Sequence, residues 1–271
     1  MNFTEQRRQQ FLTEEYYLKT KEYYEEGIPL YLESDAYDDD EYNCGEDNRW
    51  TAITDTYNSL MYIEYTAGKS IEKLVPLFEK VIESYEKQAE VLAVFHKSKK
   101  PSIIGVIGQM LSYIGLAYLL NRRDLLPRII TLINGENGER LIEDAITSRF
   151  LRFNDPHHPL IAIGDEALYN PAYHMDWCKV IDNTNDDENK RNAITYLDEY
   201  LSDWYQMNKH ELWYNSHLEP AEELRYSGYW AFEAAALVYL LDLDDSALYK
   251  YLFYPKDIVQ WARSQKPSKK L

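Results

Sequence analysis

The sequence predicts an all-α protein, and three observations support this expectation. Apolar residues recur every three or four positions through most of the 271 residues, as they do on the buried face of a helix. No segment alternates apolar and polar residues with the period of two that marks a half-buried strand. The periods of tetratricopeptide, ankyrin and HEAT repeats are also absent. We therefore expect an irregular array of antiparallel helix pairs, built as two halves that pack into one body.

Three amphipathic helices are expected in the N-terminal part of the chain. The first covers residues 4–26 and ends near Gly27 and Pro29, because both residue types disfavour a helix interior. The second covers residues 48–66. The third covers residues 70–97, and the Ser70 hydroxyl is expected to cap its start.

Residues 103–120 carry no charged side chain, and these 18 positions just reach the length of a membrane-spanning helix. Gly105, Gly108 and Gly115 dilute the hydrophobicity of this run, and no second run of this kind exists. A helix buried among amphipathic neighbours needs the same all-round apolar character. We therefore expect a core helix, in which the glycines let neighbouring helices approach closely.

The chain divides most naturally at Asn134-Gly135-Glu136-Asn137-Gly138, a strong turn sequence. This predicts an N-terminal half, residues 1–134, with an acidic loop at 33–47, and a C-terminal half, residues 135–271. Residues 154–159 are expected to be a loop, because they contain two prolines. Further helices are expected over residues 124–133, 139–150, 166–169, 171–181, 187–209, 221–241 and 255–264.

The helix expected at 221–241 contains the sequence YSGYWAFEAAA and is apolar on every side. Glu233 is the carboxylate in its middle, and an unpaired buried charge would cost several kcal/mol. Glu233 must therefore find donors, shift its pKa or face a crevice. We favour a core polar network, with Arg225, Tyr226, Tyr229 or Trp230 as donors. Partner contact and catalysis are the alternatives.

The C-terminal half resembles the PoNi family of immunity proteins. The residues that carry the resemblance are Tyr226 to Ala236, the Leu243-Asp244-Asp245 turn and the Tyr254-Pro255 pair. The N-terminal half is similar in architecture, through long helices rich in Tyr and Glu. The resemblance implies a protein that neutralises a PoNe-type DNase toxin used in competition between bacteria. The structural motif that carries it most strongly comprises Tyr226, Gly228, Tyr229, Trp230, Phe232 and Glu233.

The charge balance favours a basic partner. The chain has 46 acidic and 29 basic residues, a formal net charge of −17. Such a field repels nucleic acid and attracts cations, although many proteins are acidic simply to stay soluble. The clustering of the acidic residues favours a basic partner over a role in solubility alone. From charge alone, the residues expected to bind the toxin are Asp35, Asp38, Asp39, Asp40, Glu41, Glu46 and Asp47, with Asp182, Asp186, Asp187 and Glu188 as a second cluster.

The 25 tyrosines add an aromatic component to the expected contact surface. Many of them stand beside acids, as in Tyr37-Asp38. Tyrosine is enriched where proteins bind one another, because its ring can be buried while its hydroxyl stays hydrated. Most of these tyrosines are expected to pack between helices, and a minority to join the interaction surface.

Enzymatic motifs are absent from the sequence. It has no GxSxG nucleophile turn and no GxxxxGK phosphate loop. We therefore expect no enzyme. The alternative hypothesis is a helical hydrolase or lyase that uses Glu233 as acid or base with His157, His158 or His174 beside it.

No metal or cofactor is expected. His157, His158, His174 and Asp176 lack the local spacing of a transition-metal site. An EF-hand loop that starts at Asp40 would place Tyr42 and Cys44 where oxygen ligands belong.

Cys44 and Cys178 form no CxxC pair, which argues against a disulfide framework or structural zinc. Residues 1–6 lack the basic and apolar run of a secretory signal, so a cytoplasmic location is expected.

Overall fold

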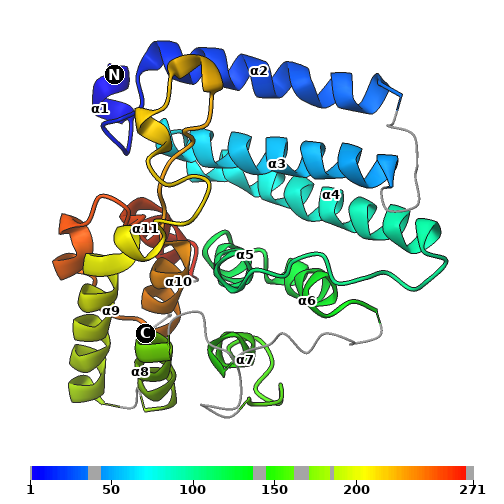
Figure 1. Cartoon of the computed structure of the whole chain (residues 1–271). Helices are drawn as coiled ribbons and strands as arrows, with labels where there is room; N and C mark the ends of the chain where they lie inside the picture. The colour runs from blue at the N-terminus through cyan, green and yellow to red at the C-terminus, as the bar shows by residue number, and fades with distance from the viewer. Residues whose placement is uncertain (1, 36–43, 137–144, 162–170, 184–185, 267–271) are drawn as a thin grey trace. The chain divides into compact units, whose positions relative to one another are not determined.

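The computed structural model describes residues 2–35, 44–136, 145–161, 171–183 and 186–266. Within these ranges all regular structure is helical, and no strand occurs (Figure 1). The prediction of an all-α protein is confirmed. Pairing of helices throughout the chain and packing of two halves into one body stay predictions.

The chain forms two compact units. Unit 1 comprises Met1–Ile103, Ile130–Arg140 and His210–Tyr229, and unit 2 comprises Ile104–Ile129, Leu141–Lys209 and Trp230–Leu271. Each unit combines segments from both sides of position 134. The division into halves at residues 134 and 135 stays a prediction.

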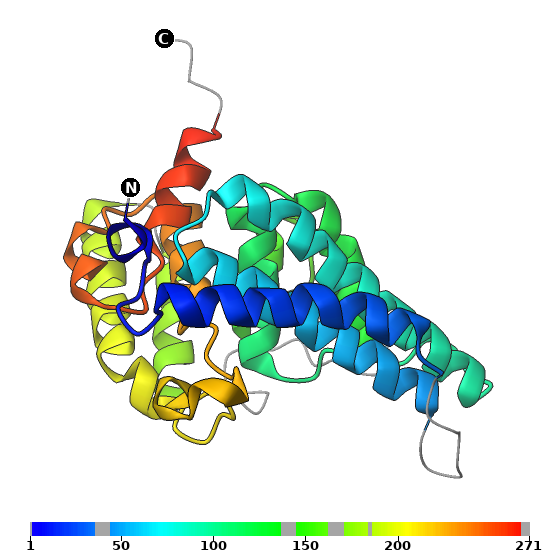
Figure 2. The same ribbon diagram turned by 90° about the horizontal axis from the view of Figure 1, so that it is seen from above.

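Unit 1 is built on three long helices that lie side by side in Figures 1 and 2. Its helices are α1 (Phe3–Gln6), α2 (Glu14–Glu33), α3 (Gly45–Thr66) and α4 (Leu74–Phe95), with 3-10 turns at Ile71–Lys73, Ser216–Leu218 and Ala221–Glu223. Tyr17, near the start of α2, bonds to Glu64, near the end of α3. Gln88, late in α4, bonds to Asp47 at the start of α3. Neighbouring helices of this unit therefore run in opposite directions.

The prediction of one helix over residues 4–26 was wrong in two respects. The chain forms α1 and α2 with a break between them, and α2 continues through Gly27 and Pro29 to Glu33. The Thr13 hydroxyl starts α2 by accepting a hydrogen bond from the backbone N–H of Tyr16 at 3.2 Å. Pro29 lies on the exposed side of α2, where water can replace the hydrogen bond that proline cannot donate.

Unit 2 contains the most apolar helices. Its helices are α5 (Ile107–Leu119), α7 (Ala145–Arg152), α8 (Pro171–Asp182), α9 (Asp187–Met207), α10 (Phe232–Leu241) and α11 (Lys256–Ser264), with 3-10 turns at Arg123–Leu125 and Ser246–Lys250. Helix α6 (Leu126–Asn134) begins in unit 2 and ends in unit 1. Helix α5 packs on α10, and both are largely buried.

The contact between α5 and α10 depends on a glycine. A Cβ atom at Gly115 would lie 3.0 Å from the Cβ of Ala236 and 3.2 Å from the carbonyl oxygen of Phe232. Close helix approach at a glycine of this run, as expected from the sequence, is therefore confirmed at Gly115. At Gly108 an added Cβ would meet nothing within 4 Å. In the described ranges, no helix has both the length and the apolar character that crossing a bilayer requires.

The prediction of a helix over residues 221–241 was wrong at its start. Helix α10 begins at Phe232, so Glu233 lies in its first turn and not in its middle. Gly228 has a φ of +125°, which interrupts helical geometry and which other residue types rarely adopt. The N–H of Ala231 donates to the carbonyl of Phe253 at 3.0 Å and precedes the first turn of the helix.

Most other predicted helices are confirmed to within a few residues. They are the helices expected at 48–66, 70–97, 103–120, 171–181, 187–209 and 255–264. The Ser70 side chain, however, makes no capping hydrogen bond. The helix expected at 139–150 is described only from Ala145, and the one expected at 166–169 lies outside the described residues.

Candidate functional site

Tyr226 and Tyr229, which carry part of the resemblance to the PoNi family, bond to Gln9 in unit 1. The side chain of Gln9 is fully buried. Its Oε1 atom accepts hydrogen bonds from the Tyr226 hydroxyl at 2.6 Å and from the Tyr229 N–H at 3.0 Å. Its Nε2 atom donates to the Tyr229 carbonyl at 2.6 Å. A buried amide that is satisfied on both sides holds its partners in one geometry. Gln9 therefore fastens residues 226–229 to the segment between α1 and α2.

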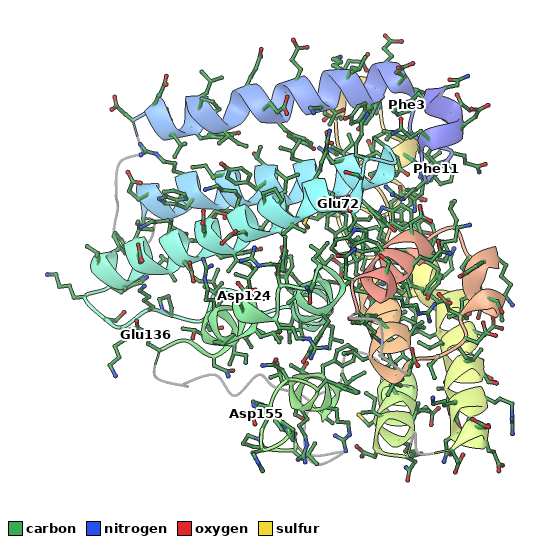
Figure 3. All side chains as sticks on the ribbon, turned by 180° about the vertical axis from the view of Figure 1, so that it is seen from behind. Phe3, Phe11, Glu72, Asp124, Glu136 and Asp155 are labelled. Carbon is green, nitrogen blue, oxygen red and sulfur yellow. The ribbon has the colours of Figure 1, made fainter. Side chains whose placement is uncertain are left out.

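The Tyr229 hydroxyl is the centre of a second set of contacts in unit 1. The backbone N–H of His217 donates to it at 3.0 Å, and the His217 Nδ1 atom lies 2.7 Å from it. The ring of Phe11, which is labelled in Figure 3, lies 4.1 Å from the His217 ring. Burial lowers the pKa of His217. The lowered pKa favours the neutral imidazole. The cluster is therefore a group of packed aromatic rings whose polar atoms are hydrogen-bonded.

Glu233 is enclosed within unit 2 by three donors. Its Oε1 atom accepts from the Tyr200 hydroxyl at 2.9 Å and from Trp204 Nε1 at 2.8 Å, both from α9. Its Oε2 atom lies 3.5 Å from the Ser112 hydroxyl of α5. Burial raises the pKa of Glu233, and these hydrogen bonds to the carboxylate oppose the rise. The expected core polar network is confirmed.

The donors to Glu233 differ from those suggested by sequence. The hydroxyls of Tyr226 and Tyr229 bond to Gln9 and to His217 in unit 1. The actual donors, Tyr200 and Trp204, stand about thirty positions earlier in the chain. No local pattern marks them, because their contact with Glu233 depends on how α9 packs within unit 2.

We call the residues that carry the resemblance to the PoNi family the signature. Its two remaining parts, the Leu243-Asp244-Asp245 turn and the Tyr254-Pro255 pair, meet at Asp245, which is also buried in unit 2. The Tyr254 hydroxyl donates to Asp245 Oδ2 at 2.6 Å, and Arg263 Nη1 donates to Oδ1 at 2.8 Å. Burial and the carboxylate beside it raise the pKa of Tyr254, which keeps the phenol protonated. The Leu243-Asp244-Asp245 turn and the Tyr254-Pro255 pair therefore form one structural contact.

The first acidic cluster predicted to bind the toxin is only partly described. Asp35 is exposed just after α2, whereas Asp38, Asp39, Asp40 and Glu41 lie outside the described residues. Glu46 and Asp47 stand in the first turn of α3. Glu46 pairs with Arg49 at 3.1 Å, and Asp47 accepts from Gln88 at 2.9 Å. Their binding role stays a prediction.

Two residues of the second acidic cluster, Asp182 and Asp186, stabilise the structure of unit 2. Asp182 accepts three hydrogen bonds of 2.7–3.0 Å from the buried Arg149 guanidinium. Asp186 caps α9 by accepting from the Asn189 N–H at 2.8 Å. Asp187 and Glu188 are exposed in the first turn of α9. Their binding role is likewise a prediction.

The histidines of the enzyme hypothesis are only partly described. His157 and His158 lie in the predicted loop after α7, where the N–H of His157 donates to Asp155 Oδ1 at 2.9 Å. The side chain of His174, in α8, lies outside the described residues. Across the described ranges, no three His, Cys, Asp or Glu side chains are grouped to hold a metal ion.

These contacts define a helical scaffold in which Tyr226, Tyr229, Glu233, Asp245 and Tyr254 are buried and hydrogen-bonded. Residues 144–258 match the family model described as PoNe immunity proteins (PoNi), C-terminal. The match contains Tyr226, Gly228, Tyr229, Glu233 and Asp245, so the recognition made from these residues is confirmed over this segment. By its description, the matched family consists of immunity proteins.

A solved structure shares the fold over nearly the whole chain. The crystal structure of protein PA2201 from Pseudomonas aeruginosa superposes with a TM-score of 0.68 and 14% sequence identity. The similarity covers 96% of this chain and 92% of that chain, and at this identity it shows the fold alone. Comparison with curated proteins gives no match.

Proposed function

We propose that this protein is an immunity protein that binds and neutralises a cognate PoNe-type DNase toxin by protein contact. The observation that carries the proposal is the family match over residues 144–258. The signature residues within it support the fold through buried hydrogen bonds, so contact with the toxin falls to exposed side chains. Because a DNase acts on the chromosome, the protein would act in the cytoplasm.

The charge of the chain supports this function. A DNase must offer positive charge to phosphates, and a protein with a formal charge of −17 can offer carboxylates to those same groups. Electrostatic attraction would accelerate the encounter and make the association rate sensitive to salt. The candidate contact residues are those of the two acidic clusters, among which Asp35, Asp182, Asp186, Asp187 and Glu188 are exposed.

The surroundings of Glu233 favour binding over catalysis. Its carboxyl group is buried and its two oxygens face Tyr200, Trp204 and Ser112. A general acid or base must reach a substrate atom directly or through one water. Enclosure by three donors suits a residue that stabilises the core.

Coexpression tests the proposal. Growth of bacteria that express a cognate PoNe-type nuclease should be rescued by the wild-type protein. Rescue should persist with Glu233→Gln, provided that this variant folds. Rescue should also require a molar amount of inhibitor similar to that of the toxin. Failure of the folded wild-type protein to rescue growth would refute the proposal. Rescue that needs the Glu233 carboxylate, or only trace amounts of protein, would instead indicate an enzyme.

A further inference from the structure

Helix α2 exposes large apolar side chains on the outer side of unit 1. Leu18 is 56% exposed and Leu30 is 66% exposed, and Tyr23 and Leu32 are exposed as well. The opposite side of α2 is buried through Tyr17, Tyr24 and other residues, so the helix has its ordinary core-facing stripe in addition. An amphipathic helix normally presents polar residues to water. Several exposed apolar residues on one helix mark a surface that another molecule covers.

The segment 210–225 extends this surface beside α2. The Tyr24 hydroxyl donates to the Leu224 carbonyl at 3.0 Å, and the Tyr226 N–H donates to the Tyr16 hydroxyl at 2.8 Å. Leu212 is 97% exposed and Leu218 is 70% exposed. In Figure 2, α2 and this gold segment both face the viewer. We call the exposed side chains of α2 and of segment 210–225 the α2 face.

Glutamates surround the apolar side chains of the α2 face. The exposed ones are Glu14, Glu15, Glu22, Glu25, Glu26, Glu33, Glu211, Glu219, Glu222 and Glu223. The basic residues on this face are few, and two of them are paired. Lys21 bonds to Glu64 at 3.1 Å, and Arg225 lies 3.5 Å from Glu223. The face is therefore both apolar and strongly negative.

We propose that the α2 face is the docking surface for the cationic, DNA-binding side of the toxin. This inference rests on the proposed function. Protein interfaces combine apolar anchors at the centre with a polar rim, and the α2 face offers leucines among carboxylates. Charge selects the occupant. A second copy of this chain would bring glutamates against glutamates, whereas a nuclease brings the lysines and arginines that bind phosphates.

The α2 face also connects to the acidic cluster predicted from sequence. Helix α2 ends at Glu33, and the exposed Asp35 follows after the C-cap residue Ser34. From the sequence, the apolar residues of this helix were expected to form its packing face, and contact with the toxin was expected in the loop that follows. The exposed leucines assign the larger part of the contact to the helix itself.

Titration calorimetry and association kinetics with a catalytically inactive form of a cognate PoNe-type nuclease test the inference. Leu18→Asp with Leu30→Asp should weaken binding about tenfold or more, mainly through faster dissociation. Glu22→Lys with Glu26→Lys should slow association and flatten its salt dependence. All four positions are exposed, and circular dichroism would verify that each variant folds.

Two control variants match these changes outside the α2 face. Val94→Asp alters a side chain of α4 that is 78% exposed, and Glu199→Lys alters an exposed glutamate of α9. Both should bind the nuclease within about twofold of the wild-type affinity, as expected for residues outside an interface.

The outcomes separate the two proposals. If the wild-type protein does not bind the nuclease, the proposed function fails. If the wild-type protein binds and the α2 variants bind equally well, only the docking inference is overturned. Loss of binding confined to Asp187→Lys with Glu188→Lys would move the contact to unit 2 and overturn it too. Self-association of the wild-type protein that the leucine variants abolish would identify a second copy as the occupant.

Discussion

The hydroxyl of Tyr226 donates a hydrogen bond of 2.6 Å to the side-chain oxygen of Gln9, although 217 positions separate the two residues. The same oxygen accepts the N–H of Tyr229, and the amide nitrogen of Gln9 donates to the Tyr229 carbonyl. One glutamine near the N-terminus thereby holds the most family-like segment of the chain. The signature in unit 1 thus has a structural role that requires a residue outside the signature.

Replacement of Gln9 should destabilise the protein strongly. Gln9→Leu removes the acceptor of two buried donors and the donor of one buried carbonyl, at a cost of about 3 kcal/mol. Urea unfolding followed by circular dichroism measures this change in the free energy of unfolding. Gln10→Leu is the matched control, because Gln10 is exposed, and should change stability by less than about 0.5 kcal/mol. Equal effects of the two substitutions would contradict the role of Gln9.

The pKa of Glu233 gives a prediction for pH dependence. Burial raises this pKa in the folded protein above the ordinary value of 4.5, so the folded state holds its proton more tightly than the unfolded state. The resulting contribution to stability is fully present below pH 4.5 and is lost as the pH rises through the folded pKa. Relative to Glu233→Gln, the wild-type protein should lose up to about 1.4 kcal/mol for each pH unit in that window.

Chemical unfolding of both proteins across that pH range measures the difference, and other titrating groups cancel in it. A difference that does not change with pH would show that Glu233 titrates alike in the folded and unfolded states. A difference that grows in favour of the wild-type protein as the pH rises would show that the three donors outweigh burial.

Asp182 should contribute more to stability than its exposed neighbour Asp187. Asp182→Ala leaves the buried Arg149 guanidinium without its carboxylate, although the carbonyl of Ala145 still accepts from Nη1 at 2.8 Å. We expect a loss of about 2 kcal/mol, less than for a fully buried pair, because the Asp182 side chain is 40% exposed. Asp187→Ala should cost less than about 0.5 kcal/mol. Thermal unfolding compares them, and the reverse order would disprove the assignment.

The two glycines of α5 should respond in opposite directions to the same substitution. Gly115→Ala places a methyl group 3.0 Å from Ala236 and should destabilise the protein by about 1–3 kcal/mol, despite the helix propensity of alanine. Gly108→Ala meets open space and should stabilise α5 by up to about 1 kcal/mol. Melting temperatures of the two variants provide the measurement. A neutral Gly115→Ala would show that α5 and α10 can separate without loss.

Local patterns predicted the helices that depend on local information. The periodicity of residues 48–66 and 187–209 is a property of neighbouring residues, and both helices form close to these limits. The prediction of helix boundaries failed where contacts with residues distant in the sequence determine the backbone conformation. Helix α10 starts late because Gly228 has a positive φ and Gln9 holds Tyr229, and neither fact follows from the apolar run that suggested a longer helix.

The candidate functional site was likewise predictable only in part from the sequence. The sequence of residues 226–236 indicated the resemblance to PoNi immunity proteins. It also indicated a buried carboxylate at Glu233, because the apolar composition of this stretch requires a place in a core. The donors Tyr200, Trp204 and Ser112 were not predictable, since they come from two other helices. The exposure of Leu18 was also missed, because an apolar residue in an amphipathic helix is ordinarily assigned to its buried side.

The amino-acid sequence alone determined the all-α class, the resemblance of the C-terminal segment to PoNi immunity proteins and the negative charge of the chain. These are sums or patterns over neighbouring residues, and packing does not alter them. Tertiary structure alone decided which polar groups satisfy Glu233 and Asp245, and which side of α2 stays open to water. Hydrogen bonds and burial act across space, so they join residues whose separation along the chain carries no signal.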